Sequence, residues 1–212
     1  MVPVLGFFYP LPITLLFSGI IHWFGNIWKM HFFRSGAKIK LILLFGIPGI
    51  IASYFGAKLV PDISEILLSR LLGIFFIIYM IFLFKNKDWK IPASKPLAIT
   101  GGILTGFSSG IFGVGGAIRA AFLTAFNLKK EVFIFTAGAI GVFVDSGRVA
   151  KYFLDGITME NNMLIALAFA IPAPFLGGYA GKKLSDKIPQ AKFRNVIAFA
   201  LFLMAIKYII WP

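Results

Sequence analysis

The sequence predicts an all-α fold: a polytopic bundle of transmembrane helices with an inverted internal repeat and a Gly-rich broken or re-entrant hairpin. Of its 212 residues, 59% are hydrophobic and only 14% are charged, which leaves too little polar surface for a soluble domain. Apolar runs near twenty residues, long enough to cross a bilayer core, recur along the chain. Segments in its two halves also resemble each other.

Each expected membrane segment is an apolar run between polar or basic loops. The fourth and fifth are short and Gly-rich, so they form either a re-entrant hairpin or two crossings. Either way the chain returns to the side that it left. The expected segments are 13–33, 39–60, 66–84, 97–114, 117–128, 132–154, 161–181 and 193–211.

The distribution of charge orients these segments. The net charge is +13, but most lysines and arginines lie in short loops, as the positive-inside rule predicts, so we expect no nucleic-acid partner. The acidic loops at 62–65 and 155–160 fall on the opposite side. The basic connections, which we assign to the cytoplasm, are 29–40, 85–95, 129–130 and 182–194.

Three short matches in the same order indicate an internal repeat. The basic loop of the first copy corresponds to the acidic loop of the second, so equivalent loops lie on opposite faces. That arrangement is typical of inverted-repeat secondary transporters. The matching pairs are 32–36 with 152–156, 45–48 with 169–172, and 51–59 with 176–184.

The repeat divides the chain into a first repeat at 1–85, a cytoplasmic basic linker at 86–96 and a second repeat at 97–212. The glycine hairpin at 97–128 has almost no room for a counterpart in the first repeat. The first repeat is therefore expected to be incomplete. The chain is either a truncated product or a natural member that lost the first hairpin.

Within the glycine hairpin, the Gly-rich stretch at 101–119 ends in an arginine at membrane depth, Arg119. Gly113, Gly115 and Gly116 let backbone approach backbone or let amides point at a ligand. A helix that begins near Gly116 adds positive potential at the same place. The functional reading is a site for a small oxyanion, held by guanidinium and backbone N–H groups. The alternative is that Arg119 reaches the interface or pairs with Asp145.

Ser108 and Ser109 lie in the same break. They either donate hydroxyls to an anion or satisfy freed backbone carbonyls, as serines do in broken membrane helices. Gly102, Gly106 and Gly110 form two overlapping GxxxG steps, for which close helix packing is the favoured purpose.

Two further polar groups lie in apolar segments. Asp145 and Arg148, three residues apart, share a helix face and form either a structural ion pair or a coupling or gating pair. His22, Asn26 and Lys29 share one face of the first segment, and Asn26 and Lys29 fall near the repeat positions of Asp145 and Arg148. The two polar faces are then expected to meet. His22 either relays protons or bonds a nearby carbonyl, and Lys29 is read as reaching toward the interface.

The chain lacks the material for most catalytic sites. It has no cysteine, two histidines and eight acidic residues, so we expect no disulfide framework, no metal site and no cofactor. No Gly-Lys-Ser/Thr follows the glycines, which excludes a nucleotide P-loop. A membrane-embedded enzyme is therefore disfavoured.

The glycine motif at 106–116, followed by three more helices in a repeat, closely resembles the TauE/SafE-type family of sulfite and sulfonate-linked anion exporters. The chain departs from the commoner pattern at three positions. Ala117 takes the place of a third glycine, Phe122 stands about where a proline follows, and Arg119 is additional. The resemblance implies outward movement of a sulfur-containing or small organic anion across a prokaryotic plasma membrane.

We therefore predict a multi-pass secondary transporter of the prokaryotic plasma membrane that exports a small anion, sulfite or another sulfur-containing or organic anion. Its expected partners are that anion and the lipid bilayer, with a homodimer possible. The alternatives are a non-transporting membrane scaffold, a defective or truncated permease, and a passive channel. The candidate substrate-binding residues are Arg119, Gly113, Gly115, Gly116, Ser109 and Ser108, and the candidate path or gating residues are Asp145, Arg148, His22 and Asn26.

Overall fold

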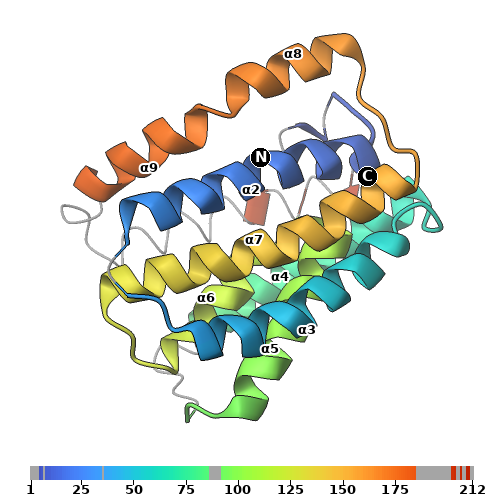
Figure 1. The fold of residues 1–212 in the computed structure, drawn as a ribbon. Coiled ribbons are helices and arrows are strands. Elements are labelled where there is room, and N and C mark those ends of the chain that lie inside the picture. The colour runs from blue at the N-terminus through green and yellow to red at the C-terminus, as the bar shows by residue number, and fades with distance from the viewer. Residues whose placement is uncertain are drawn as a thin grey trace. The chain divides into compact units, whose positions relative to one another are not determined.

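The regular secondary structure of the described chain is helical throughout (Figure 1), which confirms the all-α fold class. The computed structural model describes residues 5–6, 8–34, 36–85, 92–184, 202–203, 206 and 209–210. The helices are α2 (Leu11–Phe32), α3 (Ile39–Lys58), α4 (Glu65–Lys85), α5 (Lys95–Phe112), α6 (Gly116–Thr124), α7 (Lys130–Leu154), α8 (Asn161–Ala170) and α9 (Ala173–Leu184).

Three of the described helices, α2, α3 and α7, are long and apolar enough to cross a membrane by length and composition. They contain 22, 20 and 25 residues, which at a rise of about 1.5 Å per residue matches a hydrocarbon core of about 30 Å. Their bounds agree within a few residues with the expected segments 13–33, 39–60 and 132–154. Most of the expected segment 193–211 lies outside the described residues.

The expected segment 161–181 differs from the structure, which divides it into α8 and α9 at residues 171–172. Pro172 causes the break because it has no N–H for the helical ladder and its ring crowds the preceding turn. The chain then starts a new helix at once, and the Phe175 N–H donates to the Pro172 carbonyl at 3.1 Å.

The chain divides into two compact units. The first comprises residues 1–62 and 91–178 and holds α2, α3, α5 to α8 and the start of α9. The second comprises residues 63–90 and 179–212 and holds α4. Both units are discontinuous in sequence, so they are a different division from the two repeats and the linker. Those repeats, and their inverted relationship, stay predictions.

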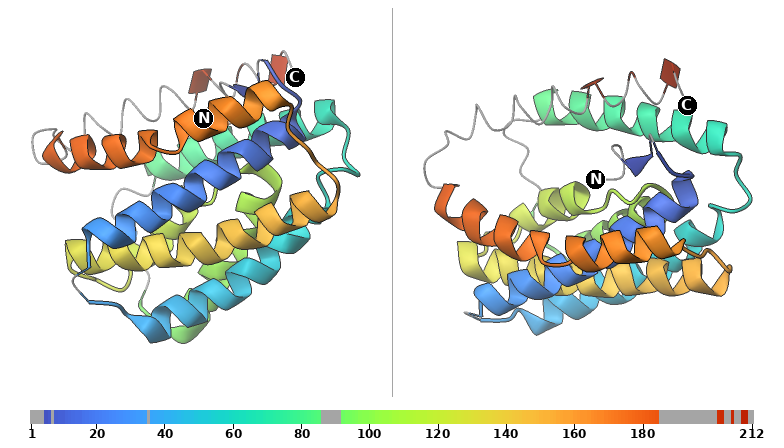
Figure 2. Two further views of the ribbon diagram at one scale, coloured as in Figure 1. Left: turned by 45° about the horizontal axis from the view of Figure 1, so that its top comes forward. Right: turned by 90° about the horizontal axis from the view of Figure 1, so that it is seen from above.

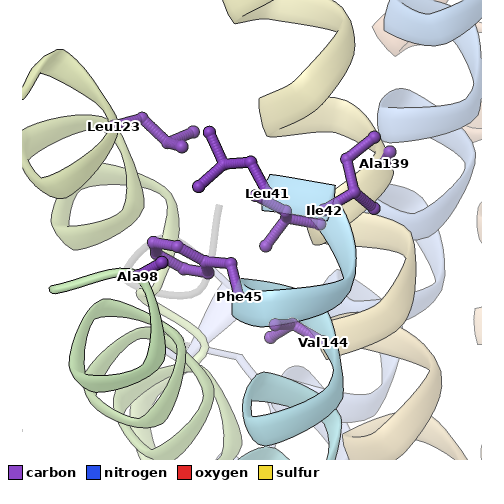
Figure 3. Close-up of a cluster of buried hydrophobic side chains, with 8 residues drawn as sticks. Leu41, Ile42, Phe45, Ala98, Leu123, Ala139 and Val144 are labelled. Atoms are coloured by element: carbon purple, nitrogen blue, oxygen red, sulfur yellow. The ribbon is translucent and has the colours of Figure 1, made fainter. Parts of the chain in front are cut away.

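In the first unit, α2 packs between α7 and α8 (Figures 1 and 2). Phe17 and Ile21 of α2 form a buried cluster with Met163 and Leu167 of α8. A second cluster joins four helices and fixes α6 against its neighbours (Figure 3). It consists of Leu41, Ile42 and Phe45 of α3, Ala98 of α5, Leu123 of α6, and Ala139, Ile140 and Val144 of α7.

Helices α3 and α5 approach until their backbones touch, which is the packing role expected for the GxxxG steps. A Cβ atom added at Gly102, Gly106 or Gly110 of α5 would overlap a carbonyl oxygen of α3. Only glycine permits this approach, which brings Cα–H groups close to facing carbonyls. The carbonyls belong, in the same order, to Phe45, Gly49 and Ser53.

A tight break joins α5 to α6. Gly113 ends α5 with φ +68°, a left-handed conformation that glycine adopts without steric cost, and its N–H donates to the Ser109 carbonyl at 2.9 Å. A Cβ at Gly115 would lie 2.7 Å from the Thr105 carbonyl oxygen. The two glycines therefore fold the chain back into a hairpin. Whether this hairpin is re-entrant in a bilayer stays a prediction.

Candidate functional site

A cavity of about 430 Å³ opens inside the first unit, between α2, the α5–α6 break, α7 and the start of α9. One part of its wall is polar or charged and the other is apolar. The polar part is formed by His22, Asn26, Lys29, Ser109, Gly115, Gly116, Arg119 and Asp145. The apolar part is formed by Ile21, Gly25, Trp28, Phe32, Phe33, Pro174 and Gly177.

The N-terminus of α6 lies in the cavity wall. The helix begins at Gly116, and its N-cap residue, Gly115, has no side chain with which to bond the first backbone N–H groups. Those N–H groups also lack intrahelical partners, because a helix satisfies them only from its fourth residue onward. The end of the helix dipole adds partial positive charge at the same place. This part of the wall is therefore able to bind an anion.

Arg119 is one turn further along α6 and lines the same cavity. The residue is only 8% exposed, and its Nε atom is buried with no hydrogen-bond partner. Among the described residues, no carboxylate forms an ion pair with it. Burying a cation without a partner is costly, and an anion in the cavity would remove that cost by accepting charge-assisted hydrogen bonds.

A glycine on α7 makes room for the Arg119 guanidinium. A Cβ added at Gly141 would lie 2.8 Å from Arg119 Nη1 and would also overlap the amide of Asn26. Any larger residue at this position would displace the two polar side chains. Gly141 is thus a positioning residue for the polar wall that the sequence patterns did not single out.

Asp145 is bonded to Arg148 and Asn26 and, among the ion pairs of the described residues, forms none with Arg119. Its Oδ1 atom accepts from Arg148 Nε at 2.9 Å and lies 2.8 Å from Arg148 Nη2. Its Oδ2 atom accepts from Asn26 Nδ2 at 2.8 Å. Asn26 in turn accepts from Lys29 Nζ at 3.2 Å. The polar faces of α2 and α7 therefore meet through Asn26 and Asp145.

The cavity is electropositive as a result. Lys29 and Arg119 line it, and the lining carboxylate, Asp145, is paired with a third cation, Arg148, so these four groups carry a formal excess of two positive charges. A concave, partly apolar wall with an excess of one sign of charge attracts ligands of the opposite sign. Within the first unit, this geometry is suited to binding an anion.

The structure brings most of the candidate residues to this cavity. Arg119, Ser109, Gly115 and Gly116, together with His22, Asn26 and Asp145, form its polar wall. Three other candidates are not among the lining residues. Arg148 lies behind Asp145, with Nη2 3.4 Å from His22 Nδ1, Gly113 shapes the break, and Ser108 is buried in α5. The binding and gating roles of all these residues stay predictions.

The sequence patterns missed much of the apolar wall. Trp28 lines the cavity, and its Nε1 atom is buried without a hydrogen-bond partner. Its ring packs edge-on against Phe175, with centroids 5.1 Å apart. The residues next to the polar face of α2 on the helical period include Trp28 and Phe32, so the sequence could have indicated that they line the same cavity. Pro174 could not be found in this way, because it belongs to a distant segment.

Comparison with known proteins finds a matching family and two similar membrane transporter proteins. A model of the family described as sulfite exporter TauE/SafE matches residues 1–208. A probable membrane transporter protein of Methanocaldococcus jannaschii is 30% identical over 189 residues, which cover 80% of this chain and 70% of the relative. A probable membrane transporter protein of Bacillus subtilis is 24% identical over 178 residues, which cover 79% and 71% respectively.

No solved structure matches the chain. The family match extends over nearly the whole sequence and includes every residue of the cavity wall. The apolar helices α2, α3 and α7 are consistent with a protein that resides in a membrane. The chain is a membrane transporter protein and belongs to the sulfite exporter TauE/SafE family.

Proposed function

We propose that this membrane transporter exports a small anion and that the anion binds in the 430 Å³ cavity against Arg119. The observation that carries the proposal is the state of Arg119, a buried cation in the cavity wall with no partner at Nε. A scaffold has no need for such a group, since an unpaired buried charge destabilises the fold that contains it. A transporter uses it to replace the hydration shell of its substrate.

Each polar element of the wall has a role in this proposal. The Arg119 guanidinium and the free N–H groups at the start of α6 bind the anion, and Ser109 adds a hydroxyl. Lys29 contributes a second positive charge from α2. Asp145 and Arg148 hold Asn26 and His22 in place along the path. We propose that the polar faces of α2 and α7 separate when the path opens and come together when it closes.

The cavity favours an organic anion over a bare oxyanion. Sulfite has four heavy atoms and would occupy a small part of about 430 Å³. The polar wall is continued by an apolar wall that contains Trp28, Phe32 and Phe33. Ligand sites of this kind bind an apolar body and orient it by a few polar groups. We therefore propose a small organic sulfonate or carboxylate as the preferred substrate, with sulfite as a weaker one.

The direction of transport follows from the charge of the substrate. We place the protein in the prokaryotic plasma membrane as a multi-pass protein, with its basic loops in the cytoplasm. An inside-negative potential then drives an anion outward with about 2.3 kcal/mol per charge per 100 mV. Export therefore needs no nucleotide.

Efflux from proteoliposomes tests the proposal. Vesicles loaded with labelled sulfite, sulfate or an arylsulfonate would carry wild type, Arg119→Gln, or the control Arg34→Gln, which alters an arginine outside the helices. We expect saturable efflux, fastest for the arylsulfonate, in wild type and the control, and loss of efflux in Arg119→Gln. Absence of any flux through folded wild type would favour a scaffold, and full flux through Arg119→Gln would remove the proposed site.

A further inference from the structure

A second cavity of about 640 Å³ lies in the first unit, at the end where α3, α5 and α7 begin. It is separate from the substrate cavity, and the two share no lining residue. The start of α3, the start of α5 and the loop between α6 and α7 surround it. Its rim carries Lys38, Lys40 and Lys95.

Among the described residues that line this cavity, none is acidic. Lys38, Lys40 and Lys95 are all exposed, and among the described residues none of them forms an ion pair. Ser94 also lines the cavity, but its hydroxyl oxygen already accepts from the Leu97 N–H at 3.2 Å to cap α5. The rim therefore presents three like charges, which attract an anion.

The floor of the same cavity is apolar. Leu41 and Ala98 belong to the buried cluster of Figure 3, and Leu44, Phe126 and Leu128 are partly buried against that cluster. A free inorganic anion would contact the lysines and leave this floor uncovered. A ligand with an anionic head and a hydrocarbon tail would cover both, because removing apolar area from water favours binding.

The position of the cavity along the helices fits the same ligand. The membrane-length helices α3 and α7 both begin at this end, at Ile39 and Lys130. A basic rim at the ends of membrane-length helices lies at the depth of lipid headgroups, and basic pockets between transmembrane helices on the cytoplasmic side bind anionic headgroups. The charge and the apolar floor thus point to the lipid bilayer itself as the source of the ligand.

We propose that this cavity is a binding site for an anionic phospholipid. The headgroup phosphate contacts Lys38, Lys40 and Lys95, and the upper part of an acyl chain lies on Leu44 and Phe126. The bound lipid would tie the start of α3 to the start of α5 and to the loop that follows α6. The proposal does not depend on the identity of the transported anion.

Native mass spectrometry and thermal unfolding of the full chain in detergent test this site. Wild type would be titrated with phosphatidylglycerol, with phosphatidylcholine of the same acyl chains, and with inorganic phosphate. We expect phosphatidylglycerol alone to form a retained adduct and to raise the unfolding temperature. An equal response to phosphatidylcholine would overturn the role of the lysines, and an equal response to inorganic phosphate would overturn the assignment to a lipid.

The variant for this test is Lys38→Gln/Lys40→Gln/Lys95→Gln, which removes the charge of three exposed side chains. The control is Lys58→Gln, at the other end of α3 and also exposed. A basic residue near a membrane surface changes anionic-lipid affinity roughly fivefold, so the triple variant should bind about a hundredfold more weakly. Phosphatidylglycerol affinity that survives in the triple variant, or falls equally in the control, would refute the proposal.

Discussion

Removing the charge of Asp145 should leave Arg148 as an unpaired cation in the interior of the first unit. Arg148 is 0% exposed and Asp145 is 4% exposed, and the two groups are joined at 2.8 and 2.9 Å. Asp145→Asn keeps the shape of the side chain and removes the charge. Breaking a buried pair from one side costs about 3–5 kcal/mol, and we expect the lower end because the amide still accepts hydrogen bonds.

Arg148→Met removes the other partner and should cost a similar amount. The double variant Asp145→Asn/Arg148→Met removes both charges of the pair, so it should be less destabilised than the sum of the single variants. The expected coupling is at least about 2 kcal/mol. Reversible unfolding in mixed micelles, followed for all four proteins, measures it. If the costs of the two single variants add up to the cost of the double variant within about 0.5 kcal/mol, the pair is not coupled.

The same double variant separates structural from functional importance. If the pair only holds α7 and α2 together, a folded double variant should transport normally. We expect instead that it folds and loses most of its efflux, because Asn26 and His22 are no longer held at the cavity by Asp145 and Arg148. Normal efflux from the folded double variant would assign the pair to structure alone.

Three further substitutions test the packing and the cavity wall. Gly106→Ala should destabilise the protein by about 1–3 kcal/mol, since the new methyl overlaps the facing α3 backbone. The control Gly177→Ala should leave the stability unchanged, because nothing lies within 4 Å of the added Cβ. Equal unfolding temperatures for the two variants would contradict the close approach of α3 and α5. Ser53→Ala should lower the free energy of unfolding by about 1 kcal/mol, because the Ser53 hydroxyl donates to the Val144 carbonyl at 2.8 Å. An unchanged free energy of unfolding would contradict a stabilising role for this hydrogen bond. Trp28→Phe should raise the KM of efflux for an arylsulfonate and leave sulfite unchanged, and equal effects on both would refute contact with the organic part.

Much of the fold follows from the sequence because a bilayer imposes a simple length rule. Apolar runs between basic loops predicted α2, α3 and α7 within a few residues, since a spanning helix must satisfy its own backbone. The break at Pro172 was not predicted, although proline supplies the physical reason. The GxxxG steps of α5 indicated close packing, but not that α3 is the partner, because interhelical register depends on contacts far apart in sequence.

The polar site was predictable where helical period applies and not beyond it. Spacings of three and four residues placed His22, Asn26 and Lys29 on one face of α2, and the structure lines the cavity with all three. Sequence left Asp145 with two possible arginine partners, and the structure pairs it with Arg148. That choice leaves Arg119 without an ion pair in the described part of the chain. The position of Arg119 depends on the fold-back at Gly113 and Gly115, which helical periodicity does not predict.

The central claim is that an anion binds against Arg119, and equilibrium binding tests it most directly. Isothermal titration of the transported anion into purified wild type, Arg119→Gln and the control Arg34→Gln separates binding from the later steps of transport. A hydrogen bond to a charged group contributes about 1.5–3 kcal/mol, so Arg119→Gln should bind about 10- to 150-fold more weakly. Wild-type affinity in a folded Arg119→Gln protein would contradict the account.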